Sequence, residues 1–127
     1  MYQEPLKPAT TYPAIVGGVL SNLRTQNGMH QKALADAVGV TQATWSRIES
    51  GQTNVTLDHL RTAARSLGMQ PSQVLAFADQ AEVEAQFRGV TVMGTKTELD
   101  INPGLALIAA AALGIVIGHV LTKGGRA

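Results

Sequence analysis

The 127-residue sequence contains no cysteine, which excludes disulfide bonds, thiolate chemistry and zinc-finger ligation. Its three histidines, His30, His59 and His119, are far apart and lack the spacing of metal ligands, so we expect no metal and no cofactor. The sequence also lacks a nucleophile elbow, a phosphate-binding loop and a dinucleotide fingerprint. These absences predict a protein that is not an enzyme.

Net charge is also low, at +1 with neutral histidines, so the overall charge does not indicate a nucleic-acid partner. Residues 1–70 hold six Lys and Arg against four Asp and Glu, residues 71–100 hold two against five, and residues 101–127 hold two against none. The basic excess therefore lies in the two end portions. A chain of this length predicts one compact domain with at most a short accessory segment.

Apolar residues recur at helical spacing over residues 14–88, and glycines stand where helices would end. The pattern predicts five short helices, which end near Gly28, Gly39, Gly51, Gly68 and Gly89. Thr41 precedes the third helix, where its hydroxyl can cap the first free amides. Before these helices, residues 1–13 contain three prolines and no basic-then-apolar run. We expect them to be a flexible lead and not a secretory signal.

The C-terminal third has a different character. Residues 89–103 alternate weakly, which favours either a small hairpin or an extended linker. Residues 104–122 contain no Asp, Glu, Lys or Arg, and as a helix they come close to the span of a hydrocarbon core of about 30 Å. Ala110, Gly114 and Gly118 form a ridge of small residues that permits close helix approach. We expect residues 104–122 to cross a membrane, followed by a basic tail at 123–127, with burial in a soluble oligomer core as the alternative.

The segment from Gln31 to Gly51 has the pattern of two crossed helices joined by a tight turn. Small or apolar residues occupy the positions where these helices must pack: Leu34, Ala35, Val38, Gly39, Val40, Trp45 and Ile48. Trp45 is large and falls at a core spacing, so we expect it to be buried.

These residues resemble the phage Cro and repressor type of helix-turn-helix family. The matching pattern is Gln31-x-x-Leu34-Ala35-x-x-x-Gly39-Val40, continued by Ile48-Glu49-x-Gly51, Leu57-x-x-Leu60 and Leu67-Gly68. The likeness extends from Ile15 to Leu75. It implies an all-α fold, a five-helix repressor-type domain, to which the chain adds a C-terminal hydrophobic helix.

The resemblance also implies which residues meet DNA, because in this family the start of the third helix points at base edges. By position, the base-reading residues are Thr41, Gln42, Ala43, Thr44 and Arg47. The positions that contact phosphates are Gln31, Gln52, Thr53 and Asn54. Gln42 has the chemistry to pair bidentately with adenine, and Arg47 with guanine. Arg24 and Glu49 occupy the positions of a structural ion pair.

The sequence thus predicts a repressor-like, sequence-specific transcriptional regulator. We expect it to bind double-stranded DNA as a homodimer, because one recognition helix covers only a half-site. Its DNA-binding domain would be cytoplasmic and anchored to the inner membrane, or part of a soluble cytoplasmic oligomer. A second class stays open, a non-catalytic protein whose helical domain binds a protein partner, as in an antitoxin or a phage or membrane assembly. Gln42 and Arg47 favour the first class, because a protein-docking helix does not need them.

Overall fold

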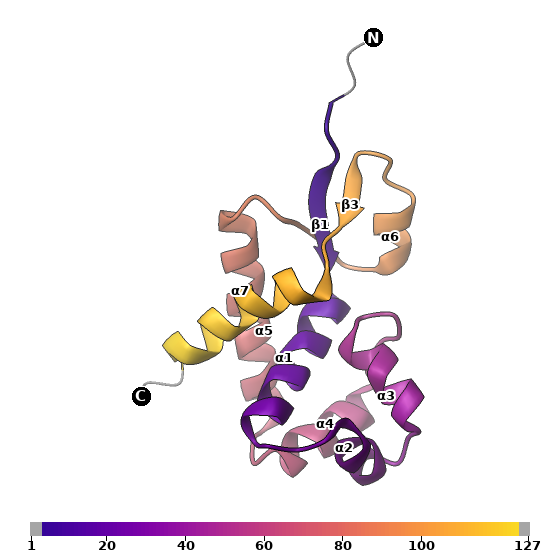
Figure 1. Cartoon of the computed structure of the whole chain (residues 1–127), viewed down its shortest axis with the longest axis vertical. Coiled ribbons are helices and arrows are strands. Elements are labelled where there is room, and N and C mark those ends of the chain that lie inside the picture. The colour runs from indigo at the N-terminus through magenta and orange to yellow at the C-terminus, as the bar shows by residue number, and fades with distance from the viewer. Residues whose placement is uncertain (1–3, 125–127) are drawn as a thin grey trace.

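The computed structural model of the protein describes residues 4–124. Strand β1 (Lys7–Thr11) is followed by helices α1 (Tyr12–Gln26), α2 (Gln31–Val38), α3 (Gln42–Glu49), α4 (Leu57–Ser66) and α5 (Pro71–Phe87). The chain continues through β2 (Thr91–Met93), α6 (Lys96–Asp100) and β3 (Leu105–Leu107) to α7 (Ala110–Gly124). Helices α1 to α5 form one body, with the strands at one end and α7 lying across α1 and α5 (Figure 1).

Helices α1 to α5 confirm the five helices that the sequence predicts, and local capping explains their limits. Gly39 ends α2 in the left-handed conformation, at φ +86°, which a glycine adopts without steric cost. Thr41 caps α3 as expected, since its Oγ1 accepts a hydrogen bond from the Thr44 amide at 3.1 Å. Thr56 caps α4 in the same way through the amide of His59, at 3.0 Å.

The core is built around α1, whose apolar face meets α3, α5 and α7. The most buried large side chains of the core, which come from five helices, are Ile15, Val19, Leu20, Leu34, Trp45, Ile48, Val74 and Ile117. The burial predicted for Trp45 is confirmed, at 0 % exposure. At Gly17 the backbones of α1 and α3 come so close that an added Cβ would collide with the carbonyl oxygen of Ile48. The glycine therefore fixes how closely α3 can dock on α1.

A polar contact ties the start of α1 to the middle of α5. The Tyr12 hydroxyl donates a hydrogen bond to Asp79 Oδ1 at 2.7 Å. Partial burial raises the pKa of Tyr12, and the hydrogen bond and negative charge of Asp79 add to this effect. Tyr12 therefore stays protonated and remains a donor throughout the neutral pH range.

The prediction of an all-α fold is wrong, because three short strands form a sheet in the order β2-β1-β3. β1 pairs in parallel with both neighbours, with Ala9 opposite Thr91 on one side and opposite Leu107 on the other. Residues 7–11, expected in a flexible lead, are thus the central strand. The hairpin considered for residues 89–103 does not form, because β2 leads into α6 and parallel strands need a longer crossover than a hairpin turn.

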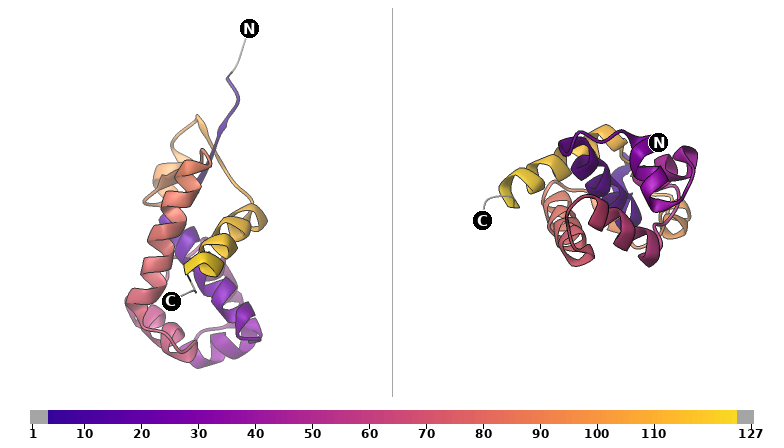
Figure 2. Two further views of the ribbon diagram at one scale, coloured as in Figure 1. Left: turned by 90° about the vertical axis from the view of Figure 1, so that its left-hand side faces the viewer. Right: turned by 90° about the horizontal axis from the view of Figure 1, so that it is seen from below.

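The prediction that residues 104–122 span a membrane is also wrong. Within residues 4–124, no helix has both the length and the apolar character that crossing a bilayer requires. The apolar run is divided between β3 and α7, and α7 has 15 residues. One face of α7 is buried in the domain core through Leu113, Val116, Ile117, Val120 and Leu121. Figure 2 shows α7 beside α1 and α5, whose apolar surface it covers.

The small-residue ridge of α7 lies along α1 of the same chain. Ala110 and Gly114 line a cavity together with Gly18 and Asn22 of α1. An added Cβ at Gly118 would lie 3.8 Å from Asn22 Oδ1, which is an ordinary contact distance. Residues 125–127, at the end of the predicted basic tail, lie outside the described residues.

Candidate nucleic-acid interface

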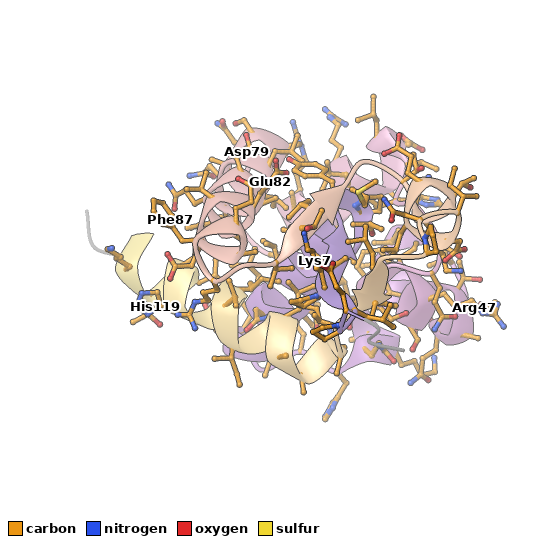
Figure 3. The ribbon with its side chains drawn as sticks, turned by 90° about the horizontal axis from the view of Figure 1, so that it is seen from above. Lys7, Arg47, Asp79, Glu82, Phe87 and His119 are labelled. Carbon is orange, nitrogen blue, oxygen red and sulfur yellow. The ribbon has the colours of Figure 1, made fainter. Side chains whose placement is uncertain are left out.

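Helix α3 has one exposed face and one buried face. Gln42, Ala43, Ser46 and Arg47 are exposed, and their spacing of i, i+1, i+4 and i+5 places them on one side of the helix. Arg47 points away from the body of the molecule, on the side opposite to Phe87 and His119 (Figure 3). The face is therefore mainly polar and open to solvent.

Thr41 and Thr44 hold the start of this helix in place. Thr41 Oγ1 accepts the Thr44 amide proton, and the Thr41 hydroxyl donates to Thr44 Oγ1 at 3.0 Å. Ser46 was not among the predicted site residues, although it lies on the exposed face one helical turn after Gln42. Counting helical turns from Gln42 would have selected Ser46 together with Arg47.

The buried side of α3 is fixed by a carboxylate that accepts four hydrogen bonds. Glu49 Oε2 accepts from Arg24 Nε at 2.8 Å and from Trp45 Nε1 at 2.6 Å. Glu49 Oε1 accepts from Arg24 Nη2 at 3.1 Å and from Gln31 Nε2 at 3.0 Å. The Glu49 side chain is only 6 % exposed, so solvent screens these contacts weakly. This network joins α1, α2 and α3 at one point.

Arg24 also forms a hydrogen bond to a group other than the Glu49 carboxylate. Its Nη1 donates to the carbonyl oxygen of Met29 at 2.9 Å, in the loop that leads into α2. The guanidinium therefore orders the connection between α1 and α2 as well as the carboxylate at the end of α3. A planar group with several donors is suited to this task, which a lysine ammonium would not perform equally.

The four residues predicted to contact phosphates fall into two groups. Gln52, Thr53 and Asn54 are exposed in the loop after α3. The amides of Gln52 and Thr53 both donate to the carbonyl oxygen of Arg47, at 2.9 and 3.2 Å, which folds this loop back against α3. Gln31 is half-buried at the start of α2, and its side chain is directed to Glu49 instead of to solvent.

Residues 15–77 match the model of a family described as a helix-turn-helix domain. These residues form a helix-turn-helix domain. The match begins in α1 and ends within α5, so it includes every residue of the interface described above. The resemblance that residues 31–51 predict is therefore confirmed. Strand β1, helix α7 and the segment between α5 and α7 lie outside the matched region.

Two solved structures have a similar fold over the larger part of this chain. The clp gene regulator ClgR from Corynebacterium glutamicum is 24 % identical, with a TM-score of 0.59 over 68 % of this chain and 86 % of that one. A second ClgR structure is 28 % identical, with a TM-score of 0.51 over 60 % and 92 %. The restriction-modification controller protein C.AhdI from Aeromonas hydrophila is 31 % identical over 48 % and 92 %, with a TM-score of 0.46. No curated protein matches the chain significantly.

Proposed function

We propose that this protein is a sequence-specific, DNA-binding transcriptional regulator whose helix α3 lies in the major groove. The observation that carries the proposal is the division of α3 into an exposed face with Gln42 and Arg47 and a buried face anchored by Glu49. A rigidly mounted helix with polar side chains on its free face is what major-groove recognition requires. ClgR, whose domain has a similar fold, is itself named as a gene regulator.

Base recognition is assigned to the exposed face of α3 and to its first turn. Gln42 offers an amide to the N6 and N7 positions of adenine, and Arg47 offers two parallel donors to the O6 and N7 positions of guanine. Ala43 and the methyl group of Thr44 suit a thymine methyl, and Thr41 caps the helix at the groove. Ser46 adds a hydroxyl on the same face.

Phosphate contacts are assigned to both sides of this helix. Gln52, Thr53 and Asn54 offer side-chain donors from the exposed loop. On the other side, the side chain of Gln31 is held by Glu49, so we assign its phosphate contact to the backbone amides at the start of α2. These contacts would set the register of α3 without selecting a sequence.

We also propose that the protein binds as a homodimer, because one α3 helix covers only a half-site. Two symmetry-related copies then require inverted half-sites whose centres are about 34–36 Å apart, or a multiple of that distance. Such a regulator works in the compartment that holds the DNA, which in a bacterium is the cytoplasm.

Selection of DNA from a random double-stranded library by the full chain tests both proposals. We expect enrichment of a pseudo-palindromic site, and an affinity whose logarithm falls linearly with the logarithm of salt concentration. The DNA-binding proposal would be contradicted if no sequence were enriched and if the affinity for DNA did not depend on salt concentration. An enriched site with a single unrepeated half-site would contradict the dimer.

A further inference from the structure

The outer face of α5 carries a row of uncharged side chains. This row, called the α5 stripe below, consists of the exposed residues Gln73, Ala76, Gln80, Val83 and Phe87. Their spacings alternate between three and four positions, which brings them to one side of a helix. The opposite side of α5 is buried in the domain through Val74, Ala78, Ala81 and Ala85. Helix α5 therefore has one seam that packs on its own chain and a second seam that is free.

The second half of the α5 stripe exposes a large apolar surface. Phe87 is 84 % exposed, and Val83, one helical turn before it, is 52 % exposed. Both border a shallow hollow together with Gln86. Adjacent exposed apolar side chains on one face are typical of protein–protein interaction sites. Val83 and Phe87 lie beyond residues 15–77, the segment that matches the family, so the helix-turn-helix domain itself does not account for them.

The two carboxylates that flank the α5 stripe have partners within the chain. Asp79 accepts the hydrogen bond from the Tyr12 hydroxyl at 2.7 Å, which directs it to α1. Glu84 forms an ion pair with Arg88 at 3.2 Å. A partner can therefore cover the stripe without burying an unpaired charge, which would be costly.

The order of side-chain sizes along the stripe fits a second copy of the same stripe in the antiparallel orientation. Small Ala76 lies in the first half, and the larger Val83 and Phe87 lie in the second half. Antiparallel pairing centred on Gln80 places Val83 opposite Ala76 of the second copy, and Phe87 opposite Gln73. Large side chains then meet smaller ones, as close packing requires. Parallel pairing would instead set Phe87 against Phe87 and leave a gap between the two alanines.

The antiparallel pair has a twofold axis beside Gln80 and leaves both α3 helices free. The side-chain amide of Gln80 has donors and an acceptor, so two copies of it can hydrogen-bond to each other across the axis. Twofold pairs are closed, and they are the most common homo-oligomers. Figure 3 shows Phe87 on the side opposite Arg47, so a second copy on the α5 stripe does not cover the exposed face of α3.

The contact that α5 alone can make is small. Helix α5 has 17 residues and is therefore about 25 Å long, and a helix with its side chains is about 10 Å wide. Pairing covers roughly 250 Å² on each copy, or about 500 Å² in total, whereas stable dimers bury about 1,200–2,000 Å². Such a dimer is weak in free solution. DNA that holds two copies side by side raises their effective concentration and strengthens the contact.

We propose that the α5 stripe is a homodimer interface in which two copies of this chain pair in antiparallel orientation about Gln80. The pair is weak and reversible in free solution and becomes stable when both copies are bound to one DNA site. The part that concerns DNA rests on the proposed function, because it requires two half-sites. The pairing itself does not depend on DNA.

Single cysteine substitutions test the orientation without DNA, because the chain has no cysteine of its own. In the antiparallel pair, two copies of residue 80 face each other across the axis. Two copies of residue 73 are about 21 Å apart, since each lies about 10.5 Å along α5 from residue 80. A disulfide requires Cα atoms within about 7 Å. Under mild oxidation we expect Gln80→Cys to form a covalent dimer and Gln73→Cys, the matched control, to stay monomeric. Equal cross-linking of the two variants, or none of Gln80→Cys, would overturn the antiparallel pairing.

Sedimentation equilibrium of the full chain without DNA tests the contribution of the apolar residues. We expect a reversible monomer–dimer equilibrium for the wild type. Phe87→Gln should raise the dimer Kd at least about tenfold, because it removes the aromatic anchor from both copies. Glutamine keeps the net charge and favours a helix, and the position is exposed, so the fold should be kept. The control is Ile115→Gln, at a 69 % exposed position of α7, which should self-associate like the wild type. A wild type that stays monomeric, or an unchanged Kd for Phe87→Gln, would overturn the proposed interface.

The part that concerns DNA is tested with the site obtained by selection. The wild type should fill the two half-sites cooperatively. Phe87→Gln should bind an isolated half-site as tightly as the wild type does and lose the cooperativity on the full site. Unchanged cooperativity in Phe87→Gln would overturn this part alone. If no DNA is bound at all, the proposed function fails, and cross-linking and sedimentation without DNA still decide whether the α5 stripe pairs.

Discussion

Replacement of Glu49 by glutamine should lower the free energy of unfolding by about 3–5 kcal/mol, because it removes one member of a buried ion pair. Each Glu49 oxygen accepts two hydrogen bonds, and glutamine turns one oxygen into a donor. Two donors then face an NH₂ group, and the guanidinium of Arg24, whose side chain is only 16 % exposed, loses its counter-charge. Urea unfolding followed by circular dichroism measures the effect.

The matched control for Glu49→Gln is Asp36→Asn. Asp36 also forms an ion pair, with Lys32 at 2.9 Å, but both side chains are more than 60 % exposed. Pairs of this kind contribute about 0.3–0.5 kcal/mol on a helix. A loss of less than about 1 kcal/mol for Glu49→Gln, similar to that of the control, would contradict the role assigned to Glu49.

Replacement of Ile117 by alanine should cost about 2–5 kcal/mol in unfolding free energy. Ile117 is 0 % exposed, and it fills the contact between α7 and α1 beside Gly18. Shortening it leaves a void in a core that has little freedom to collapse. The result measures how much α7 contributes to the stability of the helix-turn-helix domain.

Ile115 supplies the control for Ile117→Ala, because it is the same residue type, two positions away on the same helix, and 69 % exposed. Ile115→Ala should change the unfolding free energy by no more than about 0.5 kcal/mol. Equal effects at the two positions would contradict the docking of α7 on α1.

The helices of the DNA-binding part were predictable because their determinants are local. Apolar residues at helical spacing, a capping threonine and a glycine in the left-handed conformation mark the ends of α2 and α3 within a few positions of sequence. The burial of Trp45 was predictable from the same helical spacing of apolar residues. Each of these signals acts over one or two helical turns.

The sheet and the position of α7 were not predictable in this way. β2 and β3 have three residues each, too few for a clear alternation, and their common partner β1 is at the other end of the chain. The apolar run at 104–122 shows only that these residues avoid water. Whether lipid, another copy or the same chain covers them depends on the free apolar surface of α1 and α5, which sequence periodicity does not describe.

The candidate interface was predictable in part. Gln42 and Arg47 lie on the exposed face of α3, as a base-reading role requires, and Gln52 to Asn54 lie in an exposed loop. The side chain of Gln31 could not be placed from sequence, because its partner Glu49 is brought to it by the packing of α2 on α3.

The most direct test of the central claim, that α3 recognises bases, is the Kd of Arg47→Ala for the selected DNA. Loss of a bidentate contact to guanine costs about 1–3 kcal/mol, so we expect Kd to rise roughly 5- to 150-fold and the base preference at one position to relax. Arg88→Ala is the control with the same charge change. Arg88 follows Phe87 in the sequence, and Figure 3 shows Phe87 on the side opposite Arg47. Arg88→Ala should change Kd by less than about twofold, because charges so far from the DNA are screened. Equal effects of the two substitutions, or no effect of Arg47→Ala, would contradict base recognition by α3.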